Sequence, residues 1–186
     1  MKRVFDLILA ASLFLLLLIP LLLATILVIT TSKGSALYYS DRIGKNNSIF
    51  KMPKFRSMLT GTPAVATHLL DNPGAYLSPI GGFLRSTSLD ELPQLFSVLK
   101  GDMSFVGPRP ALFNQGDLIA LRTEKGVDKL LPGITGWAQV NGRDDLSIPD
   151  KVALDAEYLN RQSFWFDMKI LWMTFLKVMK RDGVSH

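Results

Sequence analysis

The longest hydrophobic stretch of the chain lies near its start, over residues 7–29. Only Ser12, Pro20 and Thr25 interrupt it with residues that are neither aliphatic, aromatic nor alanine. A stretch of this length is sufficient for a helix to cross a lipid bilayer. Pro20 lies at its centre and cannot donate a hydrogen bond to the carbonyl of Leu16. We therefore expect the helix to kink or break at Pro20.

Positively charged residues flank this apolar stretch on both sides. Lys2 and Arg3 precede it, and several lysines and arginines follow it before residue 57. Because cationic flanks favour the cytoplasmic side of a membrane, a straight span would place one flank unfavourably. A re-entrant helix that breaks at Pro20 and returns keeps both flanks on the same side. An ordinary kinked span is the alternative, since proline is tolerated in spanning helices.

The pattern beyond the apolar stretch predicts short elements. Leu37-Tyr38-Tyr39 and Ile49-Phe50 are typical of strands, and Gly44-Lys45-Asn46-Asn47 between them is a turn signal. We therefore expect a β-hairpin. Helices are predicted over Pro63–Asp71 and from Pro149 to Gln162.

The last apolar pattern, over residues 163–182, has the period of an α-helix. Nine apolar side chains fall within one half of the helical wheel, and most polar side chains fall within the other. The nine are Phe164, Trp165, Met168, Leu171, Trp172, Phe175, Leu176, Val178 and Met179, whereas Phe166, Ile170 and Met173 lie on the polar side. This pattern predicts a helix that lies in the membrane interface, and packing against a protein core is the alternative.

Composition narrows the class of protein. The chain has 186 residues, of which 48% are hydrophobic, and its net charge of +5 suits anionic partners such as lipid head groups or nucleotide phosphates. No nucleic-acid-binding motif is present, so we expect no nucleic acid partner. The absence of cysteine excludes disulfides, cysteine-zinc sites and thiol catalysis. The two histidines, His68 and His186, are too few and too far apart in sequence for a metal cluster.

The predicted fold is mainly α with a small β-hairpin. Residues 1–32 are expected to form a re-entrant membrane helix broken at Pro20. Residues 33–186 are expected to form a compact cytosolic globular part that carries interfacial amphipathic helices, among them the helix over residues 163–182.

Two adjacent carboxylates, Asp90 and Glu91, are the strongest chemical signal in the chain. Ser88 followed by Glu91 is also the pattern of a capping box, so a purely structural role is one interpretation. A helix that begins at Asp90 accommodates Pro93 better than one that begins at Ser88, because the first turn has N–H groups without partners. The helix is expected to end at Lys100, with Gly101 as its C-cap.

Either helix start would place a carboxylate among free N–H groups, which would lower the pKa of that carboxylate and keep it ionised. An ionised aspartate is suited to be a nucleophile or a Mg²⁺ ligand. Neighbouring side chains on a helix point about 100° apart, so Asp90 and Glu91 should have different roles.

Two downstream motifs have features that suit phosphate binding. The prolines of Gly107-Pro108-Arg109-Pro110 stiffen the backbone and would aim Arg109 at an anion, although an ordinary loop corner is the alternative. Residues 132–143 are rich in glycine and end in Arg143, so several backbone N–H groups would be open to a phosphate. They contain no Walker or dinucleotide pattern, and their signal is weak when taken alone.

Four motifs in this order resemble the bacterial sugar transferase family. They are Lys54-Phe55-Arg56-Ser57-Met58, Leu89-Asp90-Glu91-Leu92-Pro93-Gln94, the stretch from Lys100 to Pro110, and Pro132-Gly133-Ile134-Thr135-Gly136-Trp137. The resemblance extends from Met1 to about Asp182. The family consists of monotopic polyprenyl-phosphate phosphoglycosyl transferases. The short chain is similar to members that transfer N,N'-diacetylbacillosamine phosphate from UDP to undecaprenyl phosphate in protein N-glycosylation.

The resemblance implies a catalytic domain in which Asp90 is the nucleophile, Glu91 is its partner and Mg²⁺ binds near Asp90. The candidate residues for binding the substrate phosphates are Lys54, Arg56, Arg85, Arg109 and Arg143. The implied partners are a UDP-sugar, undecaprenyl phosphate, inner-membrane lipids and other glycan-assembly enzymes. The implied location is the cytoplasmic face of the bacterial inner membrane. The alternative is a membrane-anchored module that binds a lipid or a partner protein without catalysis.

Overall fold

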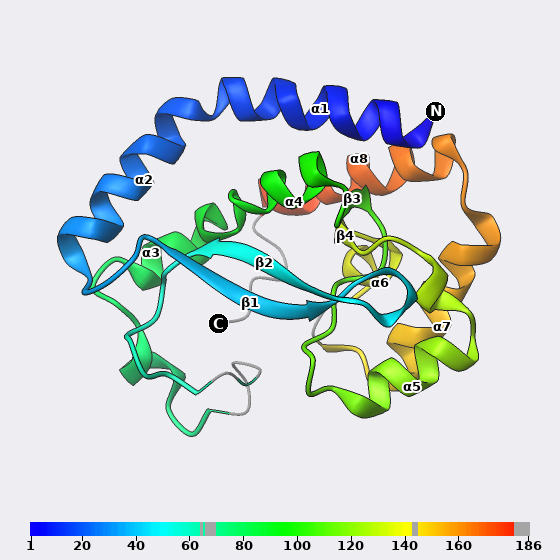
Figure 1. Ribbon diagram of the computed structural model, residues 1–186. Helices are drawn as coiled ribbons and strands as arrows, with labels where there is room; N and C mark the ends of the chain where they lie inside the picture. The colour runs from blue at the N-terminus through cyan, green and yellow to red at the C-terminus, as the bar shows by residue number, and fades with distance from the viewer. Residues whose placement is uncertain (64, 66–69, 143–144, 181–186) are drawn as a thin grey trace.

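The computed structural model describes residues 1–186 except 64, 66–69, 143–144 and 181–186. The described part is mainly helical and contains two small two-stranded sheets, which confirms the predicted mainly-α fold with a β-hairpin. Two apolar helices, α1 and α2, arch over the remaining elements (Figure 1). His68, His186 and most of the helix predicted over residues 63–71 lie outside the described residues.

The apolar stretch forms two helices, α1 (Lys2–Leu16) and α2 (Leu18–Thr31), which are bent by 62°. The break lies at Leu17, three residues before the predicted position. Pro20 lies in the first turn of α2, where a backbone N–H needs no partner within the helix. Because proline has no N–H, it cannot donate to the carbonyl of Leu16, and the helix breaks there. Within the described residues, neither helix alone is long and apolar enough to cross a membrane. The bent pair together meets that test by length and composition.

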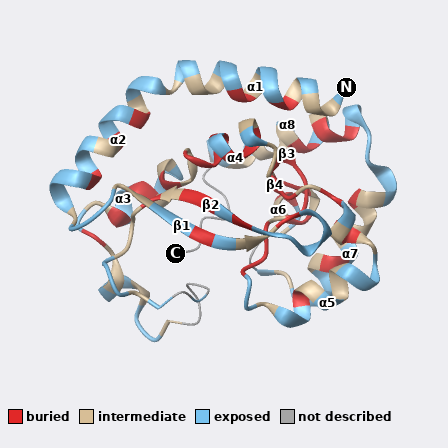
Figure 2. Cartoon of the chain, viewed as in Figure 1, coloured by how far each residue is buried: buried red, intermediate tan, exposed pale blue. Residues whose placement is uncertain are grey.

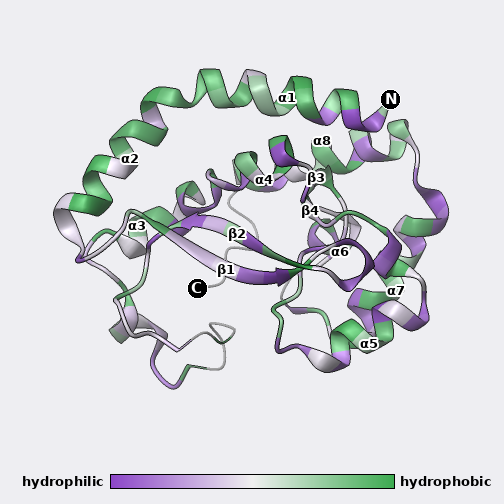
Figure 3. Ribbon diagram, in the orientation of Figure 1, coloured by the Kyte–Doolittle hydropathy of each residue, from purple (hydrophilic) through white to green (hydrophobic). Residues whose placement is uncertain are grey.

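One narrow stripe of α2 packs against the rest of the protein. Leu21, Ala24 and Val28 form a cluster with Phe55 and Leu84, while most of the remaining large apolar side chains of α1 and α2 are exposed. Figures 2 and 3 show these helices with largely exposed and strongly hydrophobic outer faces. An exposed apolar surface of this extent is typical of a site that contacts a membrane or another protein.

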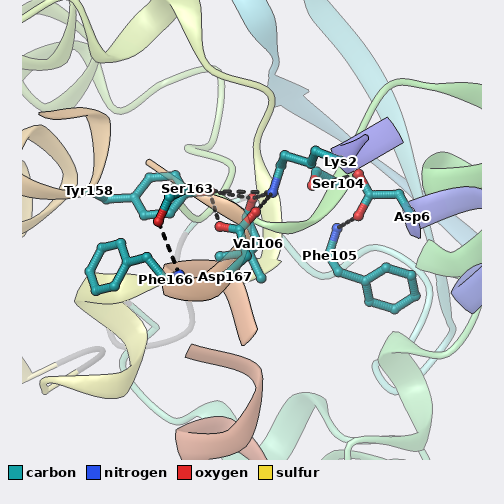
Figure 4. Close-up of polar contacts among 9 residues, drawn as sticks. All are labelled: Lys2, Asp6, Ser104, Phe105, Val106, Tyr158, Ser163, Phe166 and Asp167. Carbon is teal, nitrogen blue, oxygen red and sulfur yellow. Dashed lines mark hydrogen bonds and ion pairs between the residues drawn. The ribbon is translucent and has the colours of Figure 1, made fainter. Parts of the chain in front are cut away.

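Charged residues at the start of α1 anchor it to the globular part (Figure 4). Lys2 Nζ lies 2.6 Å from Asp167 Oδ2 and also donates to the carbonyl of Val106. The buried carboxylate of Asp6 accepts from Ser104 Oγ and the Phe105 N–H. These contacts join residues that are about a hundred or more positions apart, so the N-terminus lies against the same body that follows α2.

The predicted hairpin is confirmed. Strands β1 (Leu37–Ile43) and β2 (Ile49–Phe55) pair antiparallel, with Tyr38 opposite Lys54 and Arg42 opposite Phe50. The 3₁₀ turn η1 (Lys45–Asn47) connects them. A second sheet, which the sequence pattern did not indicate, pairs β3 (Ser104–Val106) with β4 (Gly133–Thr135) in parallel.

The remaining elements surround the two sheets. They are η3 (Pro73–Tyr76), α3 (Gly81–Ser86), η4 (Leu89–Glu91), α4 (Gln94–Lys100), α5 (Gly116–Glu124), η5 (Val127–Lys129), α6 (Trp137–Val140), α7 (Ile148–Arg161) and α8 (Phe164–Lys180). The main core lies between α1, the hairpin, β3, α4, α7 and α8. The helix predicted from Pro149 to Gln162 corresponds to α7, whose N-cap Ser147 accepts from the Asp150 N–H.

Helix α8 packs on the core through the side of the helix that was predicted to be polar. Phe166 and Ile170, which the helical wheel placed on the polar side, are buried in the core together with the anchoring carboxylate of Asp167. Trp165 and Trp172, on the predicted apolar face, are 80% and 61% exposed. Most of the predicted apolar face is therefore exposed, although Leu171 packs on the core.

Candidate active site

The two adjacent carboxylates lie on a short 3₁₀ turn between two helices. Ser88 has a left-handed conformation (φ 56°), η4 follows it, and α4 begins at Gln94 with Pro93 as its N-cap. The predicted helix starts at Ser88 and Asp90 are therefore both wrong, and the Ser88 side chain makes no capping hydrogen bond. The fixed φ of Pro93 suits the entry to α4 and not the interior of a helix that has already begun.

The predicted end of this helix is confirmed, because Gly101 follows Lys100 with a φ of 102°. This left-handed conformation is the one that favours glycine at a C-cap. Leu89 and Leu92 pack the turn on the cluster that also holds α2, while Leu95 and Val98 of α4 belong to the main core.

Asp90 is 7% exposed and lines a cleft of about 340 Å³. Glu91 does not line this cleft, and its Oε1 accepts from Lys54 Nζ at 2.8 Å and Arg109 Nη2 at 3.3 Å. The two carboxylates thus have different surroundings, in line with the expectation of different roles. Glu91 joins Lys54 of β2 to Arg109 of the Gly107–Pro110 turn.

The pKa of Asp90 differs from the sequence-based expectation. Burial raises it above the ordinary aspartate value, while the positive charge of Lys54 opposes this rise and the negative charge of Glu91 adds to it. Arg85 and Arg109 also lower it. The expected lowering by free N–H groups is wrong, because the loss of water around the carboxylate is the larger effect.

Three of the five predicted phosphate-binding residues line the cleft together with Asp90: Lys54, Arg56 and Arg85. Arg109 lies beside these residues, because its Nη2 donates to Oε1 of Glu91, the residue that follows Asp90. Arg143 lies outside the described residues. Sequence reasoning missed Arg42, which lines the cleft from β1. The predicted strand-like run ended at Tyr39, so Arg42 lay outside it; had the strand been extended to Ile43, the alternate positions Tyr38, Ser40 and Arg42 would have shared one face.

Close backbone contact holds the Arg109 turn in place. A Cβ atom at Gly107 would lie 2.3 Å from the carbonyl oxygen of Leu131, and one at Gly133 would lie 2.1 Å from the nitrogen of Gly107. The Gly133 N–H donates to the carbonyl of Pro108. Gly107 and Gly133 therefore allow β4 to pack closely against this turn, while phosphate binding by the glycine-rich segment stays a prediction.

A buried ion pair, also absent from the sequence reasoning, supports the same turn. Arg122 Nη1 donates to the carbonyl of Arg109 at 2.8 Å, while Arg122 Nε and Nη2 donate to Asp155 Oδ2 at 2.9 and 2.6 Å. Burial raises the pKa of Asp155, and the charge of Arg122 opposes that rise. No local pattern pairs α5 with α7, so the sequence carried no signal for this contact.

Binding of Mg²⁺ near Asp90 stays a prediction, and the surroundings of the two carboxylates differ in how well they suit it. Among the residues that the structure describes, no cluster of three or more His, Asp or Glu side chains could hold a metal ion. Mg²⁺ is commonly held by one or two carboxylates with substrate phosphates and water. Asp90 faces the cleft, whereas Oε1 of Glu91 is bonded to Lys54 and Arg109. Asp90 is therefore the better candidate ligand.

Comparison with known proteins places this chain in a family. The model of the family described as "Bacterial sugar transferase" matches residues 1–181. The chain is 41% identical over 190 residues to the uncharacterized sugar transferase EpsL of Bacillus subtilis (strain 168), covering 100% of this chain and 91% of that protein.

Two further relatives have names that state a reaction. The chain is 36% identical to the undecaprenyl-phosphate galactose phosphotransferase of Salmonella typhimurium, covering 98% of this chain and 41% of that protein. It is 40% identical to the UDP-glucose:undecaprenyl-phosphate glucose-1-phosphate transferase of Escherichia coli (strain K12), covering 95% of this chain and 40% of that protein. The chain thus spans about two fifths of the length of these two relatives. By the family match and these identities, the chain belongs to the bacterial sugar transferase family.

Proposed function

We propose that this protein transfers a sugar 1-phosphate from a UDP-sugar to undecaprenyl phosphate and releases UMP. The observation that carries the proposal is a nearly buried aspartate, Asp90, in a cleft lined by Lys54, Arg56 and Arg85. A diphosphate brings negative charge that such a cleft can stabilise. The names of the relatives support the same class of reaction.

The proposed reaction has two displacement steps at one phosphorus atom. In the first, an Asp90 carboxylate oxygen attacks the phosphorus that bears the sugar. The bond from that phosphorus to the oxygen shared with the uridylyl phosphate breaks, and UMP leaves with the electron pair. In the second, an oxygen of undecaprenyl phosphate attacks the same phosphorus, and the bond to Asp90 breaks. Two separate steps suit a donor in water and an acceptor in lipid, because the two need never be bound together.

The chain's own cations stabilise the charge that develops. Lys54 and Arg85 act directly on the charge of Asp90, and Glu91 holds Lys54 and Arg109 in fixed positions beside it. Fixed charges of this kind need no reorganisation during the reaction. Mg²⁺, held by Asp90 and the donor phosphates, would supply further charge neutralisation.

The apolar surfaces support a monotopic position at the cytoplasmic face of the inner membrane. Lys2 at the start of α1 pairs with Asp167 of the globular body, and α2 packs on Phe55 of the same body. This arrangement favours a re-entrant helix pair over a straight span. The exposed face of α8, with Trp165 and Trp172, would lie in the interface on that side.

The identity of the donor sugar is the most specific part of the proposal. Sequence resemblance favours UDP-N,N'-diacetylbacillosamine and a role in protein glycosylation, alongside other glycan-assembly enzymes, whereas the named relatives act with galactose and glucose. A panel of these three UDP-sugars with undecaprenyl phosphate, assayed for UMP release, identifies the donor. A membrane-bound binding module without catalysis would release UMP from none of them.

The covalent step is tested by mass spectrometry of the full-length membrane protein with the donor alone. We expect the mass of one sugar phosphate on the peptide that contains Asp90, and neither adduct nor transfer in Asp90→Asn. Asp41→Asn is the control, because Asp41 is an exposed residue of β1 whose carboxylate lies 3.8 Å from Lys51. The substitution removes the same charge outside the cleft, so the adduct and the transfer should both be retained. An adduct on another residue, or labelling retained in Asp90→Asn, would contradict the proposal.

A further inference from the structure

Lys2, at the start of α1, is bonded to the strand that leads into the Arg109 turn. Its Nζ donates to Asp167 Oδ2 at 2.6 Å and to the carbonyl of Val106 at 3.0 Å (Figure 4). A third contact, to Tyr158 Oη, is 3.3 Å long, so all three N–H groups of the ammonium have acceptors. The charge of Lys2 therefore acts within the protein, although the sequence pattern indicated only a cationic flank of a membrane helix.

The peptide group between Val106 and Gly107 is held on both sides. Lys2 binds its carbonyl oxygen, and its N–H donates to the carbonyl of Thr135 in β4 at 2.9 Å. The turn that follows contains two prolines, each of which fixes a φ angle of the backbone. Because such a turn has few soft dihedrals, a displacement of Val106 would be carried to Arg109.

Asp6, one helical turn along α1, binds the same strand. Its Oδ2 accepts from Ser104 Oγ at 2.9 Å, and its Oδ1 accepts from the Phe105 N–H at 3.2 Å. In the described part of the chain, β3 has β4 as its one strand partner. The buried Asp6 carboxylate thus gives a backbone N–H of β3 the acceptor that a second neighbouring strand would otherwise give.

Arg3 is bonded to the segment that carries the two carboxylates. Its Nη1 and Nη2 donate to the carbonyls of Val98 and Leu99 at 2.6 and 2.9 Å. Both carbonyls lie in the last turn of α4, where a cationic side chain is a suitable hydrogen-bond partner. Helix α4 continues directly from the turn of Asp90 and Glu91, so α1 is connected to that turn as well.

The two connections converge on one contact of the site. Arg109 Nη2 donates to Glu91 Oε1 at 3.3 Å, and the charges of both residues influence the pKa of Asp90. Lys2 is bonded to the strand before Arg109, and Arg3 is bonded to the helix after Glu91. Adjacent residues of α1 therefore hold the two segments that supply this contact.

We propose that Lys2, Arg3 and Asp6 position Arg109 against Glu91 for the attack by Asp90. These three residues do not line the Asp90 cleft, and they act through β3 and α4. The inference rests on the proposed function, in which Asp90 attacks the donor. It makes the first turn of an apolar membrane-facing helix a positioning element for the chemical step.

The test measures adduct formation in a single turnover with the UDP-sugar alone, using the full-length protein in lipid nanodiscs. This step needs no lipid substrate, so access of undecaprenyl phosphate does not influence it. The amplitude counts folded enzyme, whereas the rate constant reports how well the reacting groups are placed. Lys2→Met should lower the rate constant by at least about tenfold, and Lys2→Arg, which keeps the charge in a different shape, should lower it less. Lys33→Gln is the matched control, because Lys33 is an exposed cation just after α2, and it should react at the wild-type rate.

A double-variant cycle tests whether the effect of Lys2 passes through Arg109. In an Arg109→Gln background, followed for hours because this background is slow, Lys2→Met should change the rate constant by less than about twofold. The reason is that the guanidinium that Lys2 positions is then absent. Fully additive effects would overturn the inference. A Lys2→Met enzyme with a reduced amplitude and the wild-type rate constant would also overturn it, because Lys2 would then serve folding alone.

A second pair of variants keeps the inference testable if Lys2→Met does not fold. Asp6→Asn keeps the shape of the side chain, and Arg3→Gln removes the donors to α4. Both should lower the rate constant of adduct formation, and wild-type rate constants in both would overturn the inference. A wild-type enzyme that forms no adduct with the donor would instead count against the proposed function.

Discussion

Asp155→Asn tests whether the buried ion pair behind the Arg109 turn stabilises the fold. Asp155 is 1% exposed, and its Oδ2 accepts two hydrogen bonds from Arg122. The substitution removes the carboxylate charge and leaves the guanidinium of Arg122 buried without a counter-charge. The same guanidinium holds the carbonyl of Arg109, so both stability and activity should change.

Breaking a buried ion pair by removing one partner costs about 3–5 kcal/mol. For a chain of this size, 1 kcal/mol corresponds to a change of about 2–4 °C in Tm, so the expected decrease is about 6–20 °C. The assay is thermal unfolding of the detergent-solubilised protein at pH 7. The surface pair of Asp41 with Lys51 provides the matched control, because Asp41→Asn should cost no more than about 1 kcal/mol.

The double variant Arg122→Met/Asp155→Leu separates stability from positioning. Apolar residues in place of a buried ion pair are often neutral or stabilising, so Tm should return close to wild type. The carbonyl of Arg109 would still lack its donor, and kcat/KM should stay reduced. An Asp155→Asn protein that unfolds at the wild-type temperature refutes the stability argument. A double variant with full activity refutes the role of Arg122 in positioning Arg109.

Three further predictions concern the carboxylate, the membrane face and the metal. Attack requires an ionised Asp90, and the positive charge of Lys54 lowers the pKa of Asp90, so Lys54→Gln should move the acidic limb of the pH–rate profile for adduct formation to higher pH. A limb that stays in place would show that Lys54 does not act on this ionisation. In variants that retain one tryptophan each, brominated lipids should quench Trp165 and Trp172, which are exposed on α8, more strongly than Trp137, whose Nε1 donates to Glu157. Equal quenching of all three would place α8 differently. Removal of divalent ions with EDTA should stop turnover and Mg²⁺ should restore it, whereas full activity in EDTA would exclude a role for the ion.

Several local elements could be predicted from sequence because short-range chemistry determines them. The hairpin over residues 37–55 follows from strand-like runs around a turn signal, and the end of α4 follows from the freedom of Gly101 to adopt a positive φ. Pro20 predicted a break in the apolar stretch, although the bend lies at Leu17, because proline is tolerated in a first helical turn. The motifs around Asp90 were sufficient to indicate the family.

The start of α4 and the pKa of Asp90 were predicted incorrectly for related reasons. Both predictions assumed that Asp90 lies in the open first turn of a helix. Instead, Ser88 turns the chain into η4, and packing of Leu89 and Leu92 buries the turn. Burial depends on neighbours that are distant in sequence, and it is the largest influence on the Asp90 carboxylate.

The sequence by itself determined the hairpin, the apolar helices and the residue types needed for phosphoryl transfer, since these depend on neighbours within a few positions. Only the tertiary structure decided which cations meet Asp90, how Arg122 and Asp155 support Arg109, and that Arg42 enters the cleft. The parallel pairing of β3 with β4 belongs to the same group, because strands of three residues carry too short a pattern to read. Contacts between segments that are far apart in the chain arise from packing of the whole fold, and no local period encodes them.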